Sequence, residues 1–419
     1  MSGRSAERWK LCSSTLVLLL VVLVAASSRA DDRLALVGAT IYPAPGAAAI
    51  PDGVVLVERG RIVAVGPRAT VAVEADTEVL DCSGHSLTAG FWNTHVHFTP
   101  WQLMLAGWLP KWVVAQEIRD MLTRYGFVQV LDTGSLLRST VLLRERTASD
   151  PLAGPEIRIA AGRFVPVGGS PYYIKPFRNP ELATPEEARA AVIRTLDAGA
   201  DGIKIFTGGS DSPETVVVMD LEIVRAVTDA AHKRGAFVIS HPSNSAGARA
   251  AIEGGVDILS HTFPREYQGS WDHSLLPLMK QAGMALIPTI KLWKYELERE
   301  GLSAESIAQR TRVAKEQVRE FAALDGQILF GTDVGYMGDY DPTDEYVYLS
   351  EAGLSFSQIL ATLTTAPAER FAASTYSGRV GVGMDANLVV FEGNPETDIA
   401  SLARVRYVLR GGELVYRSK

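Results

Sequence analysis

Short runs of β-branched and aliphatic residues alternate with amphipathic stretches along the middle of the chain. The runs have the length and composition of buried strands, whereas the stretches between them repeat apolar residues every three or four positions, as helices do. The eight runs lie near residues 90–98, 127–134, 157–165, 202–209, 237–244, 258–263, 285–290 and 328–335. Helical patterns cover residues 185–198, 221–234 and 304–324, and a further one at 356–372 follows the last run. This alternation predicts an α/β fold with a parallel sheet closed as a TIM (β/α)8 barrel over residues 89–374.

The two ends of the chain have a different texture, with β-rich runs punctuated by glycine and no helical pattern. Residues 31–88 and 375–419 share this texture. Within the first of them, Glu58-Arg59-Gly60-Arg61 lies between two β-branched runs, which is a good hairpin signal. We therefore expect one small sheet domain that both termini form together.

The first thirty residues have the pattern of an export signal. Arg4, Arg8 and Lys10 precede an apolar run at residues 16–26, and Ser28-Arg29-Ala30 places small residues where a signal peptidase cuts. This predicts a signal peptide over residues 1–30, cleavage after Ala30, and a secreted or periplasmic protein without a stable membrane anchor. An uncleaved anchor is the alternative, and the short apolar run argues against it.

Composition excludes one class of partner and leaves others open. The chain of 419 residues is 47% hydrophobic and 21% charged, with a net charge of -7, and its basic residues form no runs. Nucleic acid is therefore not an expected partner; a small-molecule substrate is, and homo-oligomers remain open. Only Cys82 would remain after signal cleavage, so no internal disulfide can form, and it is best interpreted as a small buried apolar residue.

Histidines recur at the ends of the apolar runs. His95-Val96-His97 ends the first run, and His241 and His261 end two later ones, although the chain has only seven histidines. Alternate residues of a strand share a face, so His95 and His97 can offer imidazoles to one cation. Packed or hydrogen-bonded core histidines are the other interpretation of a lone His-x-His. In a barrel, however, the carboxyl ends of the strands meet on one face, and all four histidines converge there.

Two ionisable residues complete this predicted site. Lys204 lies inside the apolar run Gly202-Ile203-Lys204-Ile205-Phe206, where an unpaired ammonium would be costly to bury. It either pairs with an acid or loses its charge by carbamylation, which makes it an oxygen ligand for metals. Asp333 ends the eighth run, where its carboxylate can bind a cation and accept a proton, or simply cap a turn near Gly335.

These residues together carry a resemblance to the amidohydrolase superfamily, and within it to the imidazolonepropionase-like and prolidase-like branch. The most specific motifs are Thr94-His95-Val96-His97, Gly202-Ile203-Lys204-Ile205-Phe206-Thr207-Gly208-Gly209, Gly254-Gly255-Val256-Asp257-Ile258-Leu259-Ser260-His261 and Gly331-Thr332-Asp333. The resemblance implies a TIM barrel with a flanking β-sandwich and two zinc ions. It implies that the first zinc is held by His95, His97 and Asp333, the second by His241 and His261, and that carbamylated Lys204 bridges them together with a hydroxide.

The same resemblance implies hydrolysis. Asp333 would move the proton to the leaving amine and Lys204 would hold the catalytic metals, so that amide (C–N) bonds of acylated amino acids, peptides or cyclic amides are cut. The same metal site acting on an ester, lactone or phosphoester is the nearest alternative. A metal-stabilised binding protein without catalysis is a further one, although an open coordination position beside a base has no structural use.

Substrate contacts are expected after the third run. The dipeptidase-like branch often carries Gly-Gly-His there, whereas this chain has Gly168-Gly169-Ser170, which puts dipeptidase activity in doubt. Ser170 takes the place of that histidine, and Tyr172 or Tyr173 could supply a hydroxyl to the substrate or merely pack over the mouth.

Two later candidates are weaker. The aromatic loop with Trp108 and Trp112 is either an apolar substrate wall or, as we prefer, the core face of a helix. Lys291 or Lys294 would either meet a substrate carboxylate or, more commonly for lysines, lie in solvent.

Overall fold

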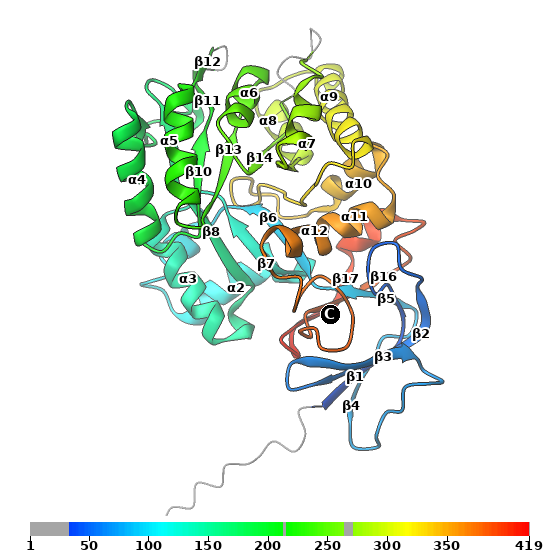
Figure 1. Cartoon of the computed structure of the whole chain (residues 1–419). Helices are drawn as coiled ribbons and strands as arrows, with labels where there is room; N and C mark the ends of the chain where they lie inside the picture. The colour runs from blue at the N-terminus through cyan, green and yellow to red at the C-terminus, as the bar shows by residue number, and fades with distance from the viewer. Residues whose placement is uncertain (1–32, 213–214, 264–270, 419) are drawn as a thin grey trace, which may run out of the picture.

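The computed structural model describes residues 33–212, 215–263 and 271–418 (Figure 1). The expected signal peptide lies outside these residues. Within them, no helix combines the length and the apolar character that crossing a membrane requires.

Parallel strands form the barrel in their order along the chain. They are β6 (Phe91–Val96), β7 (Phe127–Asp132), β8 (Glu156–Pro166), β10 (Gly202–Phe206), β13 (Phe237–His241), β14 (Ile258–Ser260) and β15 (Ala285–Ile287). Each pairs with its neighbour in parallel register. The predicted TIM-barrel architecture is confirmed.

The eighth segment of the barrel is irregular, although a strand was predicted over residues 328–335. Isolated bridges join Ile328 to Leu286 of β15 and Val334 to Val96 of β6, so this segment closes the ring without forming a ladder. Two features account for this. The backbone N–H of Thr332 bonds the Asn93 side chain, at 3.2 Å, instead of a neighbouring strand. Asp333 has a left-handed φ of 63°, which bends the segment away from regular strand geometry.

Helices surround the barrel (Figure 1). They are α1 (Trp101–Met104), α2 (Lys111–Met121), α3 (Leu137–Ser149), α4 (Pro185–Asp197), α5 (Leu221–His232), α6 (Ser245–Glu253), α7 (Leu275–Gln281), α8 (Ile290–Arg299), α9 (Ala304–Ala323), α10 (Thr343–Glu351), α11 (Phe356–Leu363) and α12 (Thr365–Arg370). The helix expected over 356–372 is divided into α11 and α12. Pro367 has no N–H to donate to Leu363, which prevents one continuous helix.

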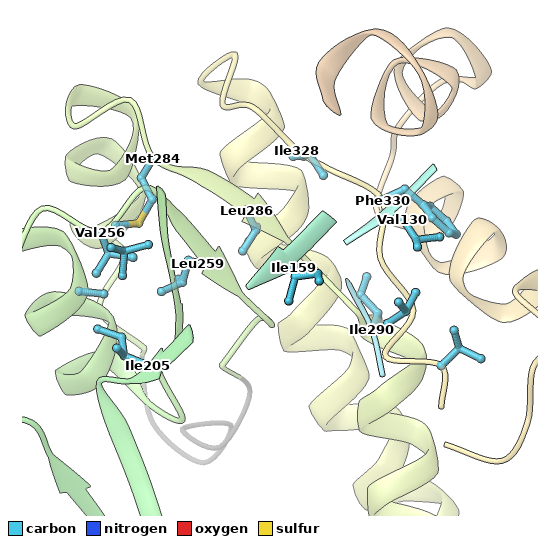
Figure 2. Packing of buried hydrophobic residues seen from close by; sticks show 14 of the residues in the cluster. Val130, Ile159, Ile205, Val256, Leu259, Met284, Leu286, Ile290, Ile328 and Phe330 are labelled. Atoms are coloured by element: carbon cyan, nitrogen blue, oxygen red, sulfur yellow. The ribbon is translucent and has the colours of Figure 1, made fainter. Parts of the chain in front are cut away.

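Apolar side chains alternate between two layers along the barrel strands. Leu131, Ala160, Ile258, Ala285 and Leu329 belong to an inner cluster inside the ring. Their sequence neighbours belong to the outer cluster, part of which Figure 2 shows: Val130, Ile159, Leu259, Leu286 and Phe330. Strand periodicity explains this division and places Lys204, between outer Ile203 and Ile205, on the inner face.

Both ends of the chain build a second sheet, which lies beside the barrel (Figure 1). Its strands are β1 (Arg33–Ile41), β2 (Ile50–Glu58), β3 (Arg61–Pro67), β4 (Glu78–Asp81), β5 (His85–Ala89), β16 (Leu388–Glu392), β17 (Val405–Arg410) and β18 (Glu413–Arg417). The predicted hairpin at Arg59-Gly60 joins β2 to β3. The C-terminal strands join the N-terminal ones through the antiparallel pairing of β16 with β5.

Cys82 behaves as expected, while two tryptophans do not. Burial keeps Cys82 out of solvent and raises its pKa to about 12.

Trp108 and Trp112 are 89% and 75% exposed, so their interpretation as a helix core face is wrong. Trp108 lies between α1 and α2, and Trp112 lies at the start of α2. The buried residues of these two helices are others, such as Leu103 and Val114.

Candidate metal centre

The strand ends bring the predicted ligands to one face of the barrel. His95 lies on β6 and His97 just beyond it, Lys204 on β10, His241 at the end of β13, His261 directly after β14, and Asp333 in the closing segment. His95, Lys204, His261 and Asp333 are buried, and His97 and His241 are half-buried. All six line the same cavity.

Distances show how closely these groups approach. One oxygen of Asp333, Oδ1, lies 2.9 Å from His97 Nε2 and 3.4 Å from His95 Nε2. The His95 and His261 rings are 4.6 Å apart between centroids, as are the rings of His241 and His261. Ligand atoms of His95, His261 and Asp333 all lie within 4.8 Å of one another. The side chains therefore point together rather than apart.

Left-handed backbone conformations mark several of the strand ends. Non-glycine residues with positive φ include Arg163 (50°), Ser243 (60°), His261 (68°), Thr289 (46°) and Asp333 (63°). Such conformations cost free energy for residues with a Cβ and cluster at functional sites. In a regular strand, Leu259 and His261 would point to the same face. With the left-handed conformation at His261, Leu259 packs in the outer cluster while His261 lines the cavity.

Residues behind the ligands fix their orientation. Thr289 Oγ1 lies 2.6 Å from His261 Nδ1, which leaves Nε2 of that ring for the cavity. The amide of Asp333 donates to the carbonyl of His95 at 2.9 Å, so these two ligands move together. At Gly335, with φ at 93°, a Cβ would lie 1.7 Å from the carbonyl oxygen of His97, so only glycine allows this approach.

Burial favours the uncharged form of two of the histidines and of Lys204. It lowers the pKa of His95 and of His261 well below the usual value, and neighbouring cationic groups lower both further. Burial also lowers the pKa of Lys204 to about 7, against the attraction of Asp333 and Asp132. Lys204 is 2% exposed and its Nζ lies 3.1 Å from Ser260 Oγ; among the described residues no acid forms an ion pair with it. The pairing interpretation of this lysine is therefore not supported.

This donor set fits a divalent metal. Neutral imidazole nitrogens and a carboxylate are the ligands that zinc prefers. Nδ1 of His95 and Oδ1 of Asp333 are buried without a hydrogen-bond partner among the described residues, although Oδ1 lies close to the two imidazoles. Buried polar atoms left in this way need a partner that the folded chain does not supply. His95, His97, His241, His261, Lys204 and Asp333 are the residues that would hold it.

The cavity above these ligands has a volume of about 590 Å³, within the usual range for small-molecule sites. Tyr172 and Tyr173 lie in its lining, and the Tyr172 hydroxyl donates to Glu300 Oε1 at 3.0 Å. Trp108 and Trp112 do not line the cavity. Its apolar wall is formed instead by Ile174, Phe206, Val216, Leu292, Trp293 and Leu297.

Three other candidates lie outside the cavity lining. Ser170 is buried, and its hydroxyl accepts a hydrogen bond from the backbone N–H of Asn179, a lining residue, at 3.0 Å. Lys291 pairs with Asp339 at 2.8 Å and Lys294 with Asp344 at 2.9 Å. Both ammonium groups are thus engaged with acids of the chain.

Sequence reasoning missed four charged residues of the lining, Arg163, Glu296, Glu300 and Arg310, of which Glu300 is exposed and the others are buried or half-buried. Arg163 is a bulged residue in β8: Gly162 pairs with Lys204 and Phe164 with Ile205, which leaves Arg163 unpaired between them. Glu296 is buried on α8, with Oε2 2.8 Å from Arg299 and Oε1 without a hydrogen-bond partner among the described residues. An arginine inside an apolar run was a usable signal for the first. The second had none, because Glu296 resembles any charged helix residue.

Comparisons with known proteins agree with this fold. The model of the amidohydrolase family matches residues 86–415. A solved Xaa-Pro dipeptidase with bound methionine superposes with a TM-score of 0.80 at 23% identity, over 92% of this chain and 100% of that one. A putative prolidase from Bifidobacterium longum superposes with a TM-score of 0.76 at 25% identity, over 92% and 95%.

Relatives found by sequence match only short stretches. A 5-methylthioadenosine/S-adenosylhomocysteine deaminase of Symbiobacterium thermophilum is 43% identical over 67 residues, 16% of this chain and 15% of the relative. An imidazolonepropionase of Rhizobium rhizogenes is 36% identical over 63 residues, 15% of this chain and 16% of the relative. The chain therefore matches less than a fifth of the length of either relative. The family match, by contrast, runs through the barrel and the C-terminal strands of the terminal sheet, and the chain belongs to the amidohydrolase family.

Proposed function

We propose that the protein is an exported binuclear zinc amidohydrolase that hydrolyses amide (C–N) bonds of acylated amino acids, peptides or cyclic amides. The observation that carries this proposal is the meeting of four histidines, Asp333 and a buried lysine with a lowered pKa at one cavity. Two divalent cations in such a site lower the pKa of water and polarise a carbonyl. Family membership supports the reaction class.

The chain's own residues have separate tasks in this proposal. His95, His97, His241 and His261 supply neutral nitrogen donors. Asp333 presents Oδ1 to the imidazoles at 2.9 and 3.4 Å, which leaves its other carboxylate oxygen to pass a proton to the leaving amine nitrogen. Lys204, carbamylated at Nζ, supplies oxygen ligands from the inner face of β10. The aromatic and apolar lining excludes water around the scissile bond.

Metal analysis followed by a hydrolysis panel tests the proposal. We expect two zinc ions per chain and turnover of N-acyl amino acids, dipeptides or cyclic amides. Turnover of only aryl esters, lactones or phosphoesters would show that the scissile bond is one of these and not an amide. Two bound zinc ions without turnover on any of these would instead indicate a non-catalytic binding protein.

Export has its own test. Mass spectrometry of the protein from its native host is expected to show an N-terminus at Asp31, because cleavage is predicted after Ala30. A retained Met1 would contradict both cleavage and release from the membrane.

A further inference from the structure

Arg163 stands out in the cavity because a strand irregularity places it there. The extra residue in β8 interrupts pairing with β10 and has a left-handed φ of 50°. Bulges beside active sites redirect a side chain that a regular strand would point elsewhere. Here the redirected residue is a cation that lines the cavity.

The Arg163 side chain lies next to the predicted metal ligands. A Cβ on Gly134 would lie 2.6 Å from Cγ of Arg163 and 3.8 Å from Cγ of Lys204, so both stems pass this glycine. Gly134 has a φ of 123°, and only a residue without a side chain leaves room for the arginine there. The Arg163 stem therefore passes close to the Lys204 stem, and Arg163 lines the cavity.

Within residues 33–212, 215–263 and 271–418, no acid forms an ion pair with Arg163. The nearest attraction comes from Asp132, but that buried carboxylate already accepts hydrogen bonds from Ser135 Oγ at 2.6 Å and Thr140 Oγ1 at 3.1 Å. Among the residues that the structure describes, Arg163 has no ion pair or hydrogen bond. A half-buried guanidinium with five unused donors suits a carboxylate, which it can bind through two parallel hydrogen bonds.

Two carboxylates line the opposite side of the cavity. Strand order places β8 third and α8 after the seventh strand, so Arg163 and Glu296 face the mouth from opposite sides of the ring. Glu296 pairs with Arg299, and Glu300, which accepts from the Tyr172 hydroxyl, also lines that side. A substrate carboxylate is attracted toward Arg163 on the β8 side, and Arg310, the other arginine of the described lining, is the alternative that the variants below distinguish.

We propose that Arg163 binds a carboxylate that lies next to the scissile amide, so that the substrates are N-acyl amino acids or peptides with a free carboxylate. This inference rests on the proposed function and narrows its substrate class. Because the Arg163 and Lys204 stems are neighbours, the carboxylate and the scissile bond must be close in the substrate, as in an amide of an α-amino acid.

Binding of two matched probes tests the inference without relying on turnover. Calorimetry compares N-methylphosphonyl-L-phenylalanine, in which a phosphonamidate replaces the scissile amide, with its C-terminal amide, which lacks the carboxylate charge. Wild-type protein is expected to bind the acid at least about tenfold more tightly than the amide. Arg163→Met keeps the stem and should abolish this difference, and Arg163→Lys should restore part of it. Equal affinity of the wild type for both probes would overturn the inference.

Two control variants test whether the preference for the acid belongs to Arg163 itself. Arg178→Met removes the same charge from an exposed residue paired with Glu181 and should leave the preference intact. Arg310 also lines the cavity; if Arg310→Met removes the preference and Arg163→Met does not, the anchor is misassigned. A loss of metal in Arg163→Met would likewise show that Arg163 supports the ligands instead of the substrate.

Turnover separates this inference from the proposed function. If the acid is preferred but no amide is hydrolysed, the carboxylate anchor stands and the amidohydrolase proposal fails. If amides are hydrolysed and Arg163→Met reduces kcat/KM equally for charged and neutral amides, the proposed function stands and the anchor fails.

Discussion

The barrel and the terminal sheet are both β-structures with buried cores, but they treat charge in opposite ways. The barrel buries Lys204, Asp333 and Glu345. Within the described strands of the terminal sheet, the buried polar residues are the uncharged Ser86 and Thr88. Burying an ionisable group costs free energy unless something compensates it. The barrel therefore carries a cost at Lys204 and Asp333 that the proposed metal site would offset, whereas the strands of the terminal sheet carry none of this kind.

Substitution of Asp333 should have the largest effect. Asp333→Asn removes the proton acceptor, and we expect kcat to fall about a hundredfold to ten-thousandfold. Steady-state kinetics on whichever amide the panel identifies measures this. Asp229→Asn, on the exposed face of α5, is the matched control and should retain full activity. Comparable rates in the two variants would remove Asp333 from the mechanism.

Loss of the Lys204 amine should change metal content. Lys204→Ala removes the oxygen ligand that carbamylation would supply, so the number of metal ions per chain should fall from two to one. Elemental analysis of purified protein checks this, with Lys294→Ala as a control lysine that pairs with Asp344 at the surface. Two metal ions in Lys204→Ala would contradict the bridging role.

A cavity in the terminal sheet should affect stability alone. Leu87 of β5 is fully buried, and Leu87→Ala should lower the free energy of unfolding by about 2–5 kcal/mol. Val79 is 55% exposed in the same sheet, and Val79→Ala should change it by less than about 0.5 kcal/mol. Denaturant titration measures both. If Leu87→Ala also empties the metal site, the two regions are less independent than the comparison implies.

Glu345 should make stability depend on pH, with a smaller effect. Burial raises its pKa from 4.5 to about 7, so the folded protein keeps a proton that the unfolded chain releases. Its contribution to stability is complete below pH 4.5 and is lost as pH rises to about 7, by at most about 3 kcal/mol. Glu345→Gln should remove this loss, and denaturation at pH 5 and pH 8 would show it. An equal pH dependence in the variant would assign the effect to other groups.

Periodicity and placement at strand ends were enough to predict the barrel and the six candidate ligands. Position along a strand decides where His95, Lys204 and His241 point, and sequence reveals that position. Backbone irregularities were beyond this reasoning. The bulge that directs Arg163 and the non-strand conformation of the closing segment depend on contacts with residues far away in the chain, such as Lys204 and Asn93. The exposure of Trp108 also depends on tertiary packing, which an apolar pattern does not reveal.

The bridges at Ile328 and Val334 make the closing segment the seam of the ring. The same seam holds Asp333, whose amide is bonded to the carbonyl of His95. A local opening there would separate two ligands at once, and anything bound between them would resist the opening. Amide hydrogen exchange at Thr94, His97 and Asp333 is therefore expected to slow when the site is filled, while exchange in β1 and β2 stays the same.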